Sequence, residues 1–125
     1  MPKILVTRRT FSEAAQALRA SGAEVVIWED ADAPSQDDLI AAVADVDGLY
    51  AHITNQVTAE VMDAAPNLKV IAEFGVGYDN IDIAAANERG IAVCNTPGIL
   101  SESTADEAFA LLASMARRTN DLPAM

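Results

Sequence analysis

The sequence has little of what several classes of protein depend on. Of its 125 residues only one is cysteine, one is histidine and six are aromatic. The single cysteine, Cys94, excludes an internal disulfide and is compatible with a reducing cytoplasm. No spacing of histidine and cysteine fits a metal site. About a fifth of the residues are alanine, which favours closely packed helices over a core of large rings.

Basic residues are also scarce. The chain has 8 Lys and Arg against 19 Asp and Glu, for a formal net charge of −11. Nucleic acid and anionic membrane surfaces need clustered positive charge, so we expect neither as a partner. No apolar run is long enough to cross a bilayer, and the opening "MPKILVTRR" lacks the shape of a signal peptide. We therefore expect a cytoplasmic protein.

Short apolar runs alternate with segments of helical spacing. Strands are expected at 3–7, 24–28, 48–53, 69–74 and 91–95, and helices follow each of them. Three helices have a hydroxyl residue followed three positions later by an acidic one, which predicts capping boxes. These pairs are Thr10 with Glu13, Ser35 with Asp38, and Ser103 with Asp106.

This alternation predicts an α/β fold. Five buried strands joined by helices favour a doubly wound parallel sheet of the flavodoxin-like type, with strand order 2-1-3-4-5. The last helix runs to about Arg118, follows the Pro97-Gly98 break and is the longest. In such sheets ligands bind beyond the carboxyl ends of the strands, so the loops there are the candidates for chemistry.

The loop Gly75-Val76-Gly77 follows the fourth expected strand and precedes a helix. A dinucleotide fingerprint would need a third glycine, but Asn80 stands in its place. Free backbone N–H groups at such a turn bind a small anion, a carboxylate as readily as a phosphate. A tight turn without a ligand explains the glycines equally well.

The other candidates each have a simpler explanation. His52 ends the third expected strand and could act as an acid or base, or serve only in packing. Arg8 and Arg9 could attract an anion or form a solvated pair. Cys94 is expected to be buried in its strand, and the hydroxyl of Thr104 could cap the last helix or contact a phosphate.

Residues 68–118 strongly resemble the D-isomer-specific 2-hydroxyacid dehydrogenases, most closely their glyoxylate and hydroxypyruvate reductase branch. The motifs that carry the resemblance are "GVGYDNID", the strand ending in "CNTPG", and "STADEAFALL" at the start of the last helix. The opening "KILVTRR" and the segment "DGLYAHITNQVTAEVMDAAPNLKVIA" are similar to the family's N-terminal part, so the resemblance covers essentially the whole chain.

The resemblance implies a role for several residues. The loop Gly75–Gly77 would bind the substrate carboxylate through backbone N–H groups, chiefly those of Val76 and Gly77. His52 and Ile53 would line the same cleft. Thr104 matches a family threonine near the cofactor, NAD or NADP. The substrate would be a small 2-keto or 2-hydroxy acid, and the full-length enzyme would be a homodimer.

The resemblance also implies a division of the chain. Residues 1–98 would form an incomplete flavodoxin-like substrate domain, and 99–125 the hinge, at 98–101, and the first helix of a nucleotide domain. The family's dinucleotide fingerprint and its catalytic Arg, Glu and His come later in the chain, so we expect this portion to be inactive alone. The alternative is a stand-alone module that binds a small acid or oligomerises without catalysis.

Overall fold

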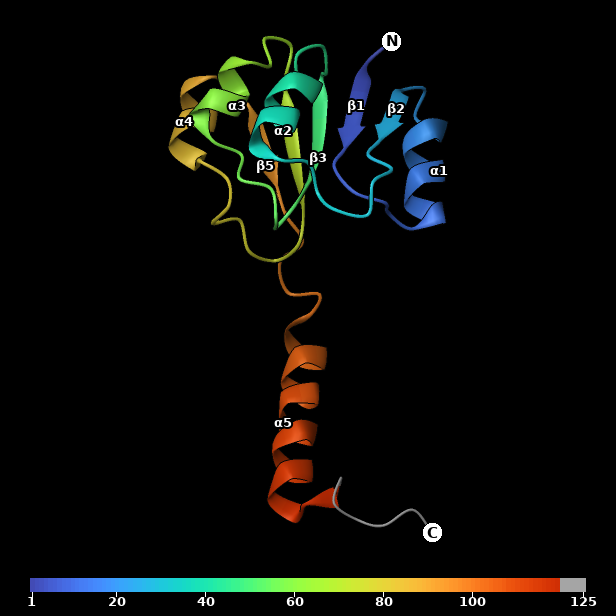
Figure 1. Ribbon diagram of the computed structural model, residues 1–125, viewed down its shortest axis with the longest axis vertical. Helices are drawn as coiled ribbons and strands as arrows, with labels where there is room; N and C mark the ends of the chain where they lie inside the picture. The colour runs from blue at the N-terminus through green and yellow to red at the C-terminus, as the bar shows by residue number, and fades with distance from the viewer. Residues whose placement is uncertain (120–125) are drawn as a thin grey trace.

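The computed structural model describes residues 1–119, which form a three-layer α/β body and a long helix that extends from it (Figure 1). The strands are β1 (Lys3–Val6), β2 (Glu24–Ile27), β3 (Gly48–His52), β4 (Val70–Phe74) and β5 (Ala92–Cys94). The helices are α1 (Ser12–Ala20), α2 (Gln36–Ala42), α3 (Ala59–Asp63), α4 (Ile83–Glu88) and α5 (Ser101–Arg117).

All neighbouring strands pair in parallel, in the order β2-β1-β3-β4-β5. This confirms the predicted fold class and strand order. The chain reverses its direction of travel across the sheet after β2. Because crossovers are right-handed, α1 then lies on one face and α2, α3 and α4 on the other (Figure 1). The carboxyl ends of β1, β3 and β4 meet at one edge, next to the start of α5.

The main core lies between the sheet and α2–α4. Leu5, Leu49 and Ile71 occupy matching register positions on β1, β3 and β4, and each is at most 2% exposed. Val43 and Val61 close the layer from the helix side with no exposed surface. Burying one such side chain stabilises the fold by about 1.5–3 kcal/mol. Packing in this layer holds the carboxyl ends of the strands in position, and the candidate site is built on those ends.

One of the three predicted capping boxes is present. Ser35 is the N-cap of α2, and its hydroxyl accepts a hydrogen bond from the backbone N–H of Asp38 at 3.2 Å. The prediction at Thr10 was wrong, because α1 begins at Ser12, whose hydroxyl donates to the neighbouring Glu13 carboxylate.

The prediction at Ser103 was also wrong. α5 begins earlier than expected, at Ser101, which places Ser103 inside the first turn. There its hydroxyl donates to the carbonyl of Leu100 at 3.2 Å. The sequence signal was misread because several hydroxyl residues occur at the start of this helix, and only backbone conformation selects the cap.

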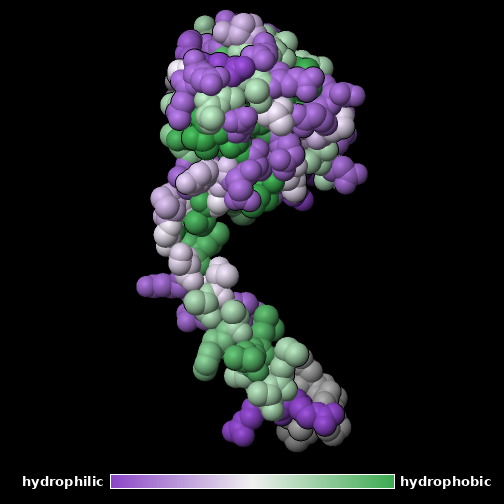
Figure 2. All heavy atoms as spheres, turned by 90° about the vertical axis from the view of Figure 1, so that its left-hand side faces the viewer, coloured by the Kyte–Doolittle hydropathy of each residue, from purple (hydrophilic) through white to green (hydrophobic). Residues whose placement is uncertain are grey.

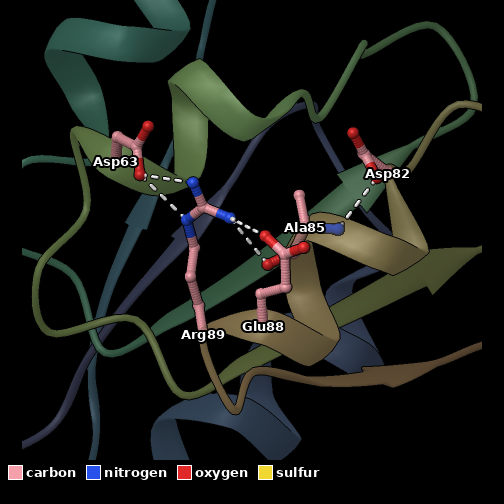
Figure 3. Close-up of polar contacts among 5 residues, drawn as sticks. All are labelled: Asp63, Asp82, Ala85, Glu88 and Arg89. Carbon is pink, nitrogen blue, oxygen red and sulfur yellow. Dashed lines mark hydrogen bonds and ion pairs between the residues drawn. The ribbon is translucent and has the colours of Figure 1, made fainter.

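Helix α4 is fixed at both ends (Figure 3). At its start, the Asp82 carboxylate accepts a hydrogen bond from the N–H of Ala85 at 2.9 Å. At its end, the Arg89 guanidinium binds Asp63 of α3, with nitrogen–oxygen distances of 2.6 and 2.9 Å. The loop between β4 and α4 therefore ends on a helix whose position is well determined.

Helix α5 leaves the body after Gly98, whose φ of +81° is in the left-handed region that favours glycine. It has no buried residue, and its apolar side chains Phe109, Leu112 and Met115 are 64–74% exposed. Figure 2 shows this apolar surface along the helix. None of the helices within residues 1–119 is long and apolar enough to span a membrane.

The sheet face on the α1 side is only partly covered. Cys94 of β5 is exposed there, which corrects the expectation of a buried cysteine. The expectation assumed helices over the whole of both faces. In the described part of the chain, α1 contacts β2 at one edge, and α5 points away from the sheet (Figure 1).

Candidate functional site

The carbonyl groups of Gly75 and Val76 in the loop after β4 are bound, while the backbone N–H groups of residues 75–80 donate to no acceptor within residues 1–119. The Gly75 carbonyl accepts from the N–H of Thr96 at 2.9 Å, and the Val76 carbonyl accepts from the Asn95 side-chain amide at 2.8 Å. Within residues 1–119, the N–H groups of Val76 and Gly77 donate to no acceptor. Adjacent unpaired N–H groups are suited to binding an anion.

The space around the loop restricts which residues fit. A Cβ atom added to Gly77 would lie 3.0 Å from an Asp79 carboxylate oxygen, which is closer than ordinary contact. At Gly75 the nearest atom would be a Glu73 carboxyl oxygen at 3.5 Å, an ordinary contact. An alanine at Gly77 would therefore displace the exposed Asp79 carboxylate slightly, whereas one at Gly75 would make only an ordinary contact.

A buried polar network lies beneath the loop, at the carboxyl ends of β1, β3 and β4. Its members are Thr7, Asn55, Glu73 and Asn80, each at most 5% exposed. The Asn80 side-chain N–H₂ donates to the Glu73 carboxyl and to the Asn55 carbonyl, both at 3.0 Å. The Thr7 hydroxyl donates to the Asn55 side-chain oxygen at 2.6 Å. The residue in the place of the third glycine thus joins the loop to the segment after β3.

The Glu73 carboxyl is in an unusual environment. It is 3% exposed, and one of its two oxygens, Oε1, has no hydrogen-bond partner among residues 1–119. Burial raises the pKa of Glu73 above its usual value, and the nearby Asp79 charge raises it further, while the hydrogen bond from Asn80 opposes both.

His52 is the last residue of β3, and its ring stacks on Phe74 with centroids 5.8 Å apart. Burial lowers the pKa of His52, and the positive charge of Arg8 lowers it further, so the ring is neutral at neutral pH. Its ring lines a hollow of about 270 Å³ on the α1 side, together with Arg8, Tyr50 and Phe74. The structure thus places the histidine side chain in a different hollow from Val76.

The other two predicted site residues are exposed. Ile53 follows His52 and is 49% exposed at the same sheet edge. Thr104 lies in the first turns of α5, and its side chain does not cap the helix. It lines an open hollow together with Val76, Leu100 and Ala108. The structure therefore brings the predicted cofactor residue next to the predicted substrate loop.

Sequence reasoning missed Asn95 and Thr96, which hold the loop carbonyls from the neighbouring strand end. The sequence did contain a signal. Asn95 directly follows an apolar strand, as Gly75 does. Because parallel strands end at the same edge of the sheet, the two segments could have been expected to lie close together. It also missed Glu73, because the alternation of a buried strand gives no reason to expect a carboxyl facing the core. No cluster of His, Cys, Asp and Glu within residues 1–119 could hold a metal ion.

The family model described as "D-isomer specific 2-hydroxyacid dehydrogenase, catalytic domain" matches residues 4–121. The chain belongs to this dehydrogenase family. The match covers nearly all of the sequence and includes the β4 loop, the buried network and α5. The family resemblance seen in the sequence motifs is thereby confirmed.

The chain is 44% identical to the glyoxylate reductase of Thermococcus litoralis over 117 residues, which are 94% of this dehydrogenase chain and 35% of that protein. It therefore spans about a third of the length of such curated relatives. A crystal structure of the TT0316 protein from Thermus thermophilus superposes with a TM-score of 0.89 at 43% identity, over 95% of this chain and 38% of that one.

A third comparison includes ligands. The NADPH-dependent glyoxylate/hydroxypyruvate reductase of Sinorhizobium meliloti, crystallised with NADP and malonate, matches with a TM-score of 0.70 and 37% identity. The match covers 90% of this chain and 34% of that one. The fold shared with these structures is the α/β fold described above.

Proposed function

We propose that this chain is part of an NAD- or NADP-dependent oxidoreductase that reduces small 2-keto acids to D-2-hydroxy acids. The substrates would be of the glyoxylate and hydroxypyruvate type. The observation that carries the proposal is the run of unpaired N–H groups that includes those of Val76 and Gly77, on a loop whose Gly75 and Val76 carbonyls are bound elsewhere. Relatives named glyoxylate reductase support the substrate class.

The chain's own residues bind and orient the substrate. The N–H groups of Val76 and Gly77 hold the carboxylate, and the Ile53 side chain and the strand end at His52 line the cleft. We assign His52 no proton transfer, because its ring stacks on Phe74 in a separate hollow. The division into a substrate domain, 1–98, and the start of a cofactor domain, 99–125, is part of this proposal.

One residue of this chain, Thr104, is suitably placed to contact a nicotinamide cofactor. Thr104 is exposed in an open hollow that it shares with Val76, so a group bound there lies beside the carboxylate site. When bound, NAD(P)H supplies the hydride for the reduction. In this portion of the enzyme only Thr104 is assigned to the cofactor, and we propose that the 125-residue chain does not turn over by itself.

Oxamate, an unreactive 2-keto acid analogue, tests the carboxylate site. We expect titration with oxamate to shift the backbone amide NMR signals of Val76 and Gly77, and ethyl oxamate, which has no charge, to leave them unchanged. Equal shifts with both compounds would contradict carboxylate recognition.

A second candidate function is a stand-alone small-acid-binding or oligomerisation module. The exposed apolar side chains of α5 favour it, since a second copy of the helix would bury them. The same helix is our proposed site for a homodimer of the full enzyme. Sedimentation over a hundredfold range of concentration separates the possibilities, and a monomer at every concentration would exclude association through α5.

NADH oxidation tests whether the chain is active alone. The purified chain is expected to show none with glyoxylate. Detectable turnover by the 125 residues alone would show that the chain needs no further catalytic group.

A further inference from the structure

Glu73 lies under the carboxylate-binding loop proposed above, and the inference made here depends on that function. Its side chain belongs to β4, two residues before Gly75, and points to the core side of the sheet with Ala51. Its Oε1 atom would lie 3.5 Å from a Cβ placed on Gly75. A carboxyl group is therefore buried directly beneath a loop whose N–H groups are arranged to receive an anion.

Two buried oxygens at this position lack a hydrogen-bond partner. They are Oε1 of Glu73 and Oδ1 of Asn80, and one donor of the same network, Nδ2 of Asn55, is also without a partner among residues 1–119. The remaining atoms of the same two groups are already bonded, since the Asn80 Nδ2 donates to Glu73 Oε2 at 3.0 Å. A carboxylate cannot satisfy the Asn80 oxygen, because it has only acceptors. The Asn55 amide is held by the hydrogen bonds that its Oδ1 accepts from Thr7 and His52. The donor that we assign to the two oxygens is therefore the O–H group of a carboxylic acid.

We propose that Glu73 is held as the neutral acid, forms a two-fold acid–amide hydrogen-bond pair with Asn80, and so acts as the positioning residue of the carboxylate-binding loop. In this pair Oε1–H donates to Asn80 Oδ1 while Nδ2 donates to Oε2. The proton satisfies both orphaned oxygens at once. Asn80 carries the effect onward, because its backbone carbonyl accepts from the N–H of Val57 and its side-chain amide donates to the carbonyl of Asn55.

The neutral form also matters for the ligand. A negative charge on the buried Glu73 would lie beneath the bound carboxylate, and like charges repel more strongly when one of them is shielded from solvent. Ionisation of Glu73 would thus both break the pair and repel the substrate. Carboxylate affinity is expected to fall by about tenfold once Glu73 is charged, at an effective dielectric near that of protein surfaces.

The charged groups around Glu73 favour the neutral form. Asp79, in the same loop, adds a negative potential, and burial acts in the same direction. His52 of β3 is on the opposite face of the sheet, where it stacks on Phe74. The acidic side chains of α3 and α4 are exposed, away from the core: Glu60, Asp63, Asp82 and Glu88.

The first measurement needs no ligand. The carboxyl carbon of Glu73, assigned by the loss of its NMR signal in Glu73→Gln, is followed from pH 4 to pH 9. We expect its pKa to lie above the ordinary value for glutamate, 4.5. Titration at the ordinary value would overturn the proposal, whether or not any ligand binds.

The second measurement is oxamate affinity across the same pH range. Glu73→Gln preserves the shape and lets its amide pair with Asn80, but it cannot ionise. We expect wild-type affinity to fall as Glu73 ionises and the affinity of the variant to remain constant. Glu60→Gln on α3 is the matched control, since that carboxylate is exposed, and its profile should follow the wild type.

The outcomes separate this inference from the proposed function. Identical pH profiles for wild type and Glu73→Gln, with oxamate bound to both, would overturn the role of Glu73 and leave the carboxylate site intact. Failure of oxamate to shift Val76 and Gly77 at any pH would overturn the proposed function and the positioning role with it. A merely structural Glu73 would change stability without changing the pH profile of binding.

Discussion

Asn80 stands where a dinucleotide fingerprint would have its third glycine, and the structure gives the reason. Its side chain reaches back to Glu73 and Asn55, so the residue that disqualifies the loop from pyrophosphate binding is the one that fixes its shape. The sequence alone identified the glycines and the missing third glycine. It could not identify the network, because hydrogen bonds among residues 7, 55, 73 and 80 depend on which strand ends meet.

The buried carboxyl predicts how stability depends on pH. The folded state raises the pKa of Glu73 above its ordinary value, so folding favours the protonated form. This contribution is complete below about pH 4.5, the unfolded value, and is lost as the pH rises through the folded-state pKa. Glu73→Gln should therefore gain stability relative to wild type as the pH rises, by on the order of 1–2 kcal/mol.

Urea unfolding at a series of pH values between 4 and 9 measures this difference. The exposed Glu60→Gln variant supplies the reference curve, because it removes a carboxylate without altering a buried one. A constant difference between Glu73→Gln and wild type across the range would show that Glu73 ionises equally in the folded and unfolded chain.

At the scale of the elements, each strand and helix was predictable in kind, and only their ends were not. Alternating apolar runs and helical spacing were sufficient, because this sheet is buried on its α2–α4 face. The helix starts were less certain: a hydroxyl followed three residues later by an acid was a true cap only at Ser35. At Ser103 the same pattern lies inside the helix, because the start is set by the backbone at Leu100.

This difference predicts unequal effects of two similar substitutions. Ser35→Ala removes the acceptor for the N–H of Asp38 and should lower the free energy of unfolding by about 1 kcal/mol. Ser103→Ala removes a hydroxyl that bonds only to a preceding carbonyl, and should change it by less than about 0.5 kcal/mol. Thermal or urea unfolding followed by circular dichroism compares them. A larger loss at Ser103 would restore the sequence-based assignment of that cap.

At the scale of the whole molecule, the sequence predicted a compact sheet and a separate final helix, but not the direction of that helix. The direction of α5 is set by the short connection at Pro97, Gly98 and Ile99. Three residues are too few to show the hydrophobic periodicity from which structure is predicted. The partly open sheet face was missed for the same reason, since its exposure, and that of Cys94, follows from where α5 goes.

Gly98→Ala should redirect α5 while leaving the body stable. At φ +81° an alanine is strained by about 1–2 kcal/mol, and nothing lies within 4 Å of its Cβ to hold it there. The connection should relax to another conformation. Because α5 buries no residue, the unfolding midpoint should stay within experimental error of wild type.

Spin labels on Cys94 and on an Ala113→Cys substitution would report the change. The label-to-label distance distribution measured by pulsed electron resonance should shift in Gly98→Ala and remain as in wild type for the control Ile99→Ala. An unchanged distribution in Gly98→Ala would show that contacts between α5 and the body, and not the glycine, set its direction.

The geometry at Gly98 also makes α5 a lever arm. A helix of 17 residues is about 25 Å long at 1.5 Å per residue. A rotation of roughly 10° at its base therefore displaces its far end by about 4 Å. At the base itself, beside Val76, the same rotation moves atoms very little. The substrate loop thus lies next to the axis of such a rotation, so the carboxylate site keeps its shape. Groups bound to the distal half of α5 would instead move toward or away from the site.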